Sequence, residues 1–172
     1  TIMPVFILAG LAVLCNNVIF PWFLHGDMLA KFQVFGTAIS NGTLNIASVL
    51  IAPLIAYFLS RNKGFENAIS SSAIALSALF IMLAINVSVT PTGATKAVEV
   101  TGVVLYSHIG TTGMFAGIII GLLVTELYMA MSKVKAFKID LGDQVPPAVG
   151  KSFTVLIPSL LTLSIFAVLQ QF

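Results

Sequence analysis

The stretch GMFAGIIIGLLV, from Gly113 to Val124, decides the fold class. It lies inside an apolar block of about 109–132, in which Glu126 is the one acidic or basic residue. At a rise of 1.5 Å per residue a helix of this length measures about 36 Å, enough to cross the roughly 30 Å hydrocarbon layer of a membrane. Because peptide groups in lipid find no water to bond, the block is expected to be a spanning helix.

Four further apolar blocks lead to the same interpretation. The sequence therefore predicts an all-α fold, a polytopic membrane bundle of five transmembrane helices. The predicted spans are about 2–24, 38–59, 67–89, 109–132 and 149–172. The second reaches membrane length only by including 38–45, a segment rich in Ser, Asn and Gly. The alternating pattern that marks membrane β-strands is missing.

The composition excludes several classes of function. Of 172 residues, 58% are hydrophobic and only 8% charged, whereas a soluble domain carries about a quarter charged residues. A formal net charge of +2 is too small for a nucleic-acid surface. Cys15 is the single cysteine, so no thiolate metal cluster or internal disulfide is possible, and no Ser, His and Asp set suggests a hydrolase. We assign no catalytic residue, no metal site and no cofactor.

The distribution of Lys and Arg predicts the topology, because cytoplasmic loops carry the excess of these residues. One side holds six of them, namely Arg61, Lys63, Lys133, Lys135, Lys138 and Lys151. The opposite side holds two, Lys31 and Lys96. We therefore expect the amino end of the first helix in the cytoplasm and the end of the fifth outside. The first residue is not Met and the last is still apolar, so the chain is expected to be part of a larger protein.

Gly113, Gly117 and Gly121 recur every fourth residue, which leaves one face of the fourth span without side chains. In lipid, small residues let two helix backbones approach closely. This face is predicted to pack within the bundle or, as the alternative, between two protomers.

Three polar side chains are candidates for a solute path, although no substrate-binding residue is assigned. Asn16 and Asn17 lie deep in the first span, where a carboxamide needs a partner, so an interhelical hydrogen bond is the structural interpretation. His108 lies at the outer boundary of the fourth span, where an interfacial role is the simpler interpretation. Glu126 lies about two turns before Lys133 and is expected to anchor that end by contact with a basic neighbour or lipid headgroups. A proton or substrate role is its alternative.

The segment Gly142-Asp143-Gln144-Val145-Pro146-Pro147-Ala148-Val149 is the most specific in the chain. Its two prolines remove backbone donors and favour extended backbone before the fifth helix. We name Asp143, Val145, Pro146 and Pro147 the signature loop.

This loop, with the following Gly150-Lys151-Ser152-Phe153 and Leu156-Ile157-Pro158, resembles the Val-Pro-Pro-Ala-Val, Ser-Phe and Leu-Ile-Pro signature of a known family. The family is the membrane component, enzyme IIC, of the lactose, cellobiose and β-glucoside class of the bacterial sugar phosphotransferase system. Two other stretches, 113–123 and 50–57, are similar to the family's fourth and second helices. The resemblance extends over essentially the whole chain.

The resemblance implies a multi-pass protein of the bacterial inner (plasma) membrane that imports a disaccharide or oligosaccharide. A cytoplasmic IIB partner would phosphorylate the sugar during import. It further implies that 1–172 is the amino-terminal, dimer-forming domain, and that the sugar-binding carboxy-terminal half, with the family's site His and Glu, is absent. Neither His108 nor Glu126 lies in the corresponding motif. Two other functions are kept as alternatives to a sugar permease. One is a self-contained small channel or membrane-enzyme subunit, and the other is a proton-coupled carrier that uses Glu126.

Overall fold

The computed structural model of the chain describes residues 2–84, 86–93, 96–137 and 147–172. Within these residues the protein consists mainly of helices, which confirms the predicted fold class. Three helical segments are long and apolar enough to cross a membrane, namely Met3–Phe23, Asp27–Asn62 and Met114–Lys133. Two shorter apolar helices, Ala68–Ile81 and Phe153–Leu169, accompany them.

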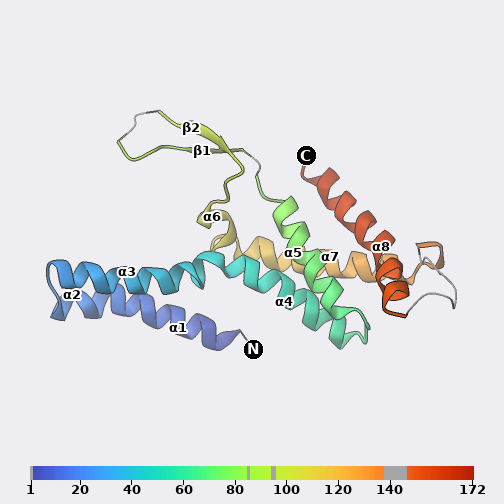
Figure 1. Ribbon diagram of the computed structural model, residues 1–172, viewed down its shortest axis with the longest axis horizontal. Helices are drawn as coiled ribbons and strands as arrows, with labels where there is room; N and C mark the ends of the chain where they lie inside the picture. The colour runs from blue at the N-terminus through green and yellow to red at the C-terminus, as the bar shows by residue number, and fades with distance from the viewer. Residues whose placement is uncertain (1, 85, 94–95, 138–146) are drawn as a thin grey trace.

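The chain begins with a helical hairpin that projects to one side of the molecule (Figure 1). Its first arm comprises α1 (Met3–Leu14), a π-helical turn (Cys15–Ile19) and α2 (Phe20–Phe23). The chain reverses at Gly26, whose φ of 65° is a conformation that glycine adopts without strain. The second arm, α3 (Asp27–Asn41), packs back along α1.

The body of the molecule is a bundle of four helices. These are α4 (Ala47–Asn62), α5 (Ala68–Ile81), α7 (Met114–Lys133) and α8 (Pro147–Leu169). Helix α4 packs against both α5 and α7, and α8 packs against α5 and α7. Four of the ten described residues that are buried in the core between them are alanines, which let the helix backbones approach closely. Its buried members are Ala52, Ala56, Ile74, Ala75, Ala78, Leu79, Ile120, Val124, Tyr128 and Phe166.

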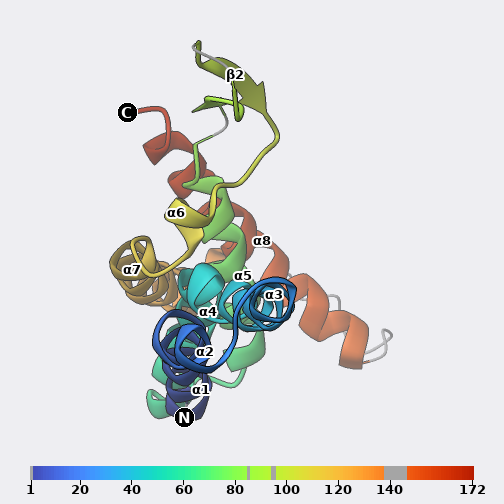
Figure 2. The ribbon, with the colours of Figure 1, turned by 90° about the vertical axis from the view of Figure 1, so that its left-hand side faces the viewer.

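A β-hairpin stands apart from the helices in both views (Figures 1 and 2). Strand β1 (Asn86–Val89) pairs antiparallel with β2 (Val98–Thr101), and Val87 lies opposite Val100. The chain then passes through the short helix α6 (Tyr106–Ile109) into α7, and a 3₁₀ turn (Lys135–Phe137) follows α7.

The predicted second span, 38–59, has the wrong boundaries. Helix α3 ends at Asn41, and a 3₁₀ turn (Leu44–Ile46) separates it from α4. At this break the Thr43 hydroxyl donates a 2.7 Å hydrogen bond to the Ile39 carbonyl, and Gly42 weakens helix propagation. The residues around Lys31, which were expected in an outer loop, instead form α3, with Asp27 favourably placed in its first turn.

The predicted third span, 67–89, extends too far, because α5 ends at Ile81 and 86–89 is strand. Hydropathy alone cannot separate these residues from a helix, but Val87 and Val89 are β-branched and favour a paired strand. The predicted fourth span, 109–132, begins too early: α7 starts only at Met114, after a turn rich in Gly and Thr. The fifth prediction, 149–172, agrees with α8 within a few residues.

Candidate functional site

The glycine face of α7 lies against α4. A Cβ atom on Gly117 would lie 3.0 Å from the Ser48 Cβ, and one on Gly121 would lie 2.8 Å from the Ala52 carbonyl oxygen. Ser48 and Ala52 are themselves fully buried. Gly117 faces Ser48, and four residues later Gly121 faces Ala52, four residues after Ser48. Helices α4 and α7 therefore run parallel, with their backbones in close contact. In the described residues, this face is therefore used inside the bundle.

Gly113 has a different role from the other two glycines. It is the residue before α7, and a Cβ there would collide with the carbonyl oxygen of His108. Ser48 stabilises the same corner, because its buried hydroxyl donates a 2.9 Å hydrogen bond to the Ile109 carbonyl. The His108 side chain is exposed on α6. The corner thus fixes the entry into α7, and nothing in the described residues converges on the imidazole.

Asn16 and Asn17 lie in the π-helical turn of the projecting hairpin. Asn16 Nδ2 donates a 3.3 Å hydrogen bond to Thr37 Oγ1 on α3, which is an interhelical bond. Asn17 Nδ2 instead donates to the Val13 carbonyl of its own helix, at 2.9 Å. Gly36 allows the two helices to approach, because a Cβ there would lie 2.6 Å from Asn16 Oδ1. Both carboxamides thus have structural roles, while contact with a sugar stays a prediction.

Glu126 forms an ion pair with Lys63, which follows α4. The expectation of a basic neighbour for Glu126 is therefore confirmed. Both side chains are about half exposed, at 48% and 51%, so the pair is solvated and contributes little to stability by itself. It joins the turn between α4 and α5 to the last third of α7.

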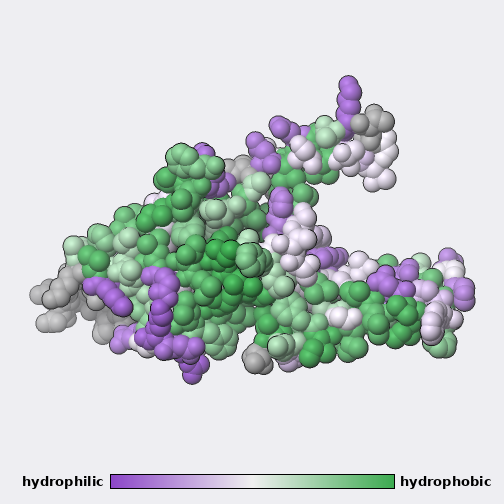
Figure 3. All heavy atoms as spheres, turned by 180° about the vertical axis from the view of Figure 1, so that it is seen from behind, coloured by the Kyte–Doolittle hydropathy of each residue, from purple (hydrophilic) through white to green (hydrophobic). Residues whose placement is uncertain are grey.

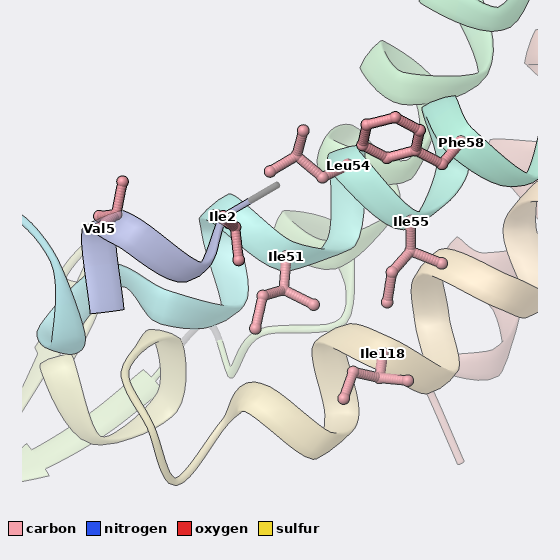
Figure 4. A pocket seen from close by; sticks show the side chains of 7 residues that line it. All are labelled: Ile2, Val5, Ile51, Leu54, Ile55, Phe58 and Ile118. Atoms are coloured by element: carbon pink, nitrogen blue, oxygen red, sulfur yellow. The ribbon is translucent and has the colours of Figure 1, made fainter. Parts of the chain in front are cut away.

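Next to this ion pair lies a hollow of about 390 Å³, which contains both charged and apolar groups. Its walls include Lys63, Glu126, Lys133, Phe65, Met129 and Ala130. A separate, wholly apolar groove of about 480 Å³ lies between the start of α1 and the pair α4 and α7 (Figure 4). Figure 4 shows Ile51 and Ile55 of α4 opposite Ile118 of α7, with Val5 of α1 and the preceding Ile2 on the left-hand side of the groove.

Buried hydroxyl groups are a feature that the sequence reasoning missed. Tyr128 and Ser60 are fully buried. The hydroxyl groups of Ser70, Ser132 and Ser159 lie around the Tyr128 hydroxyl, whereas the Ser60 hydroxyl has no hydrogen-bond partner among the described residues. The Tyr128 ring contacts Phe65 edge to face, with 5.5 Å between centroids. Thr125 and Thr162, also fully buried, donate to carbonyls one turn earlier in their own helices.

Most of the signature loop lies outside the described residues. This applies to Asp143, Val145 and Pro146, whereas Pro147 is the first residue of α8. A proline suits that position, since the missing amide hydrogen would have had no helical partner. Over the described ranges no group of three or more His, Cys, Asp or Glu side chains could hold a metal ion. The described helices thus form a packed bundle with several hollows on its surface.

Known proteins share both the sequence and the fold. A family model described as "Phosphotransferase system, EIIC" matches residues 1–172. The oligo-beta-mannoside-specific EIIC component of Bacillus subtilis is 35% identical over 169 residues, which are 97% of this chain and 36% of that protein. The lichenan permease IIC component of the same organism is 34% identical, over 91% of this chain and 35% of that protein.

The cellobiose-specific EIIC component of Geobacillus stearothermophilus is 34% identical over 69% of this chain and 26% of its own length. Among solved structures, the transporter ChbC, the IIC component of an N,N'-diacetylchitobiose-specific phosphotransferase system, superimposes with a TM-score of 0.83. That match has 25% identity and covers 97% of this chain and 39% of ChbC. The chain thus spans about a third of the length of these relatives. From the full-length family match and the shared helical architecture, we conclude that the chain belongs to the EIIC family of membrane components of the phosphotransferase system.

Proposed function

We propose that this chain is the amino-terminal membrane scaffold of a phosphotransferase-system sugar permease. The intact permease imports a disaccharide or oligosaccharide of the cellobiose, lactose or β-glucoside type and hands it to a cytoplasmic IIB protein for phosphorylation. The proposal rests on the match to EIIC components over the whole chain, three of which carry cellobiose, lichenan or oligo-β-mannoside in their names.

The packing of the bundle supports a scaffold rather than a substrate site. Sugar sites need several polar groups that converge on one cavity. The side chains that line the groove of Figure 4 are all hydrocarbon, and His108 lies on α6, apart from the π-helical turn that holds Asn16 and Asn17. Close contacts such as Gly117 against Ser48 make α4 and α7 one rigid unit. A second domain can move against such a unit in alternating access.

The scaffold is further proposed to form a homodimer and to hold its amino end in the cytoplasm. The excess of Lys and Arg near the α4 to α5 turn and after α7 supports this orientation. The projecting α1 to α3 hairpin exposes large apolar side chains that require lipid or protein contact, among them Leu11, Trp22 and Phe35. Light scattering of the detergent-solubilised full-length permease measures the protein mass of the particle. A homodimer predicts twice the mass of one protomer.

Uptake by the full-length permease tests the function. In cells with the cytoplasmic phosphotransferase proteins, labelled cellobiose should accumulate as its phosphate, and removal of IIB should abolish phosphorylation. Uptake of unmodified sugar without IIB would contradict the proposal. For the scaffold role, His108→Ala and Asn17→Ala should leave the affinity of the purified full-length permease for cellobiose unchanged. A tenfold loss of affinity in a normally folded variant would place that residue in the sugar site.

A further inference from the structure

The groove of Figure 4 and the charged hollow lie along one seam between α4 and α7. On α7, Ile118 borders the groove and Glu126 borders the hollow. These positions are separated by eight residues, with Leu122 midway, so all three lie on the same face of the helix. Leu122 is 43% exposed, so the strip between the two hollows is also open to the surroundings. The seam is apolar over most of its length and charged at one end.

The length of the seam fits one leaflet of a membrane. From Ile118 to Glu126 the helix rises about 12 Å, close to half of the roughly 30 Å hydrocarbon layer. The neighbouring wall on α4 runs from Ile51 to Phe58 and then reaches Lys63. Figure 3 shows a broad apolar surface over the bundle, with one group of hydrophilic residues at the lower left and others on the two parts that project to the right. An acyl chain can therefore lie along the apolar part while its headgroup remains at the charged end.

The charges at that end favour an anion. Lys63 and Lys133 line the hollow with Glu126, which gives two positive charges and one negative charge, or +1 in sum. Lys63 is paired with Glu126, whereas Lys133 is exposed and forms no ion pair with any residue that the structure describes. Glu66, which lines a neighbouring hollow together with Lys133, and Arg61, in the last turn of α4, add one charge of each sign. Lys133 is thus available to a phosphate group, while Phe65 and Met129 flank it with apolar surface.

We propose that the α4 to α7 seam binds a phospholipid whose headgroup carries one net negative charge, such as phosphatidylglycerol. Its acyl chain lies against Ile55, Ile118 and Leu122, and its phosphate lies at Lys133. Basic pockets between spanning helices at the cytoplasmic surface bind anionic headgroups in this way, and each Lys near the surface contributes about 1 kcal/mol. This inference depends on the membrane placement of the bundle and not on which sugar the permease carries.

Native mass spectrometry of the delipidated full-length permease tests the site, with phosphatidylglycerol and phosphatidylcholine titrated separately. We expect tighter binding of phosphatidylglycerol, and Lys133→Gln should weaken it about fivefold with no change for phosphatidylcholine. Lys133→Arg keeps the positive charge and should therefore keep the preference for phosphatidylglycerol. This comparison distinguishes loss of charge from a defect in folding. Lys31→Gln is the matched control, because it removes the same charge from an exposed position on α3.

Three results would overturn the proposal. The first is equal binding of the two lipids by the unmodified permease, and the second is an equal loss for Lys133→Gln and Lys31→Gln. The third is efficient disulfide crosslinking of Ile55→Cys between protomers, because a second copy would then occupy the seam. Cellobiose uptake measured on the same preparations distinguishes these outcomes from failure of the transport function itself.

Discussion

At the level of single residues, Gly121 is the position where α4 and α7 tolerate the least change. A Cβ there would meet a backbone oxygen, that of Ala52 at 2.8 Å, and backbone cannot rotate away as a side chain can. We expect Gly121→Ala to destabilise the full-length permease by about 1–3 kcal/mol, as overpacking of a tight contact does. Thermal unfolding in detergent measures the effect.

Gly10 supplies the matched control for this substitution. It lies within α1, and a Cβ there would have nothing within 4 Å. Gly10→Ala should be neutral or stabilise the protein by up to about 1 kcal/mol, because alanine favours the helix. If both alanines lowered the unfolding temperature equally, the close approach of α4 and α7 would not be the cause.

Gly36 and Asn16 are expected to be coupled, because the added Cβ in Gly36→Ala would lie 2.6 Å from Asn16 Oδ1. Gly36→Ala should therefore displace the carboxamide and break its hydrogen bond to Thr37. Such bonds in membrane proteins contribute about 0.6 kcal/mol on average. In the Asn16→Ala background the same substitution should cost much less, and a double-mutant cycle of unfolding free energies measures the difference. Strictly additive changes in unfolding free energy would contradict a contact between Gly36 and Asn16.

At the level of elements, the Lys63 to Glu126 pair joins the α4 to α5 turn to α7. Because both side chains are about half exposed, a double-mutant cycle with Lys63→Gln and Glu126→Gln should give a coupling of only about 0.2–1 kcal/mol. The coupling should shrink as salt is added, since exposed charges are screened. Zero coupling at low salt would mean that the pair is not formed in solution.

The same Glu126→Gln variant tests whether the carboxylate takes part in transport. As an anchor beside Lys63, Glu126 should be dispensable, and sugar uptake by the full-length permease should stay close to that of the unmodified protein. A loss of uptake with normal membrane insertion would instead support a proton or substrate role.

The elements also show which parts of the fold the sequence predicts. The apolar composition of 109–132 and 149–172, in which Glu126 and Lys151 are the only acidic or basic residues, is enough to predict α7 and α8. Hydropathy could not predict the strand at Val87, because a short apolar run suits a strand or a helix equally, and pairing with Val100 decides between them. Only 38–41 of α3 fall within a predicted span. The rest of this helix, which contains Asp27 and Lys31, has too low an average hydropathy to be predicted as part of a span.

The candidate site was predicted less well than the fold. Four-residue spacing in the sequence identifies the glycine face of α7. It cannot identify the partner, because Ser48 is 69 residues from Gly117. The seam between α4 and α7 depends on the relative position of two distant helices, and no local pattern carries that information.

At the level of the whole molecule, the orientation of the bundle makes a direct prediction. The β-hairpin and the α4 to α5 turn lie at opposite ends of α5, so they should lie on opposite sides of the membrane. In intact cells that express the full-length permease with Cys15→Ala, Ser88→Cys should react with a membrane-impermeant maleimide and Asn62→Cys should not. The reverse pattern would invert the topology, and labelling of both would indicate damaged cells or misfolding.

The segment Asp27–Asn62 consists of α3 and α4, which are about 22 and 24 Å long and together exceed the roughly 30 Å thickness of the hydrocarbon layer. Its two halves meet at a joint of four or five residues around Thr43. Because α3 is about 22 Å long, a swing of about 10° at that joint would carry the hairpin tip through about 4 Å while α4 stays locked to α7. The projecting hairpin is thus joined to the closely packed bundle through one short break in the helix.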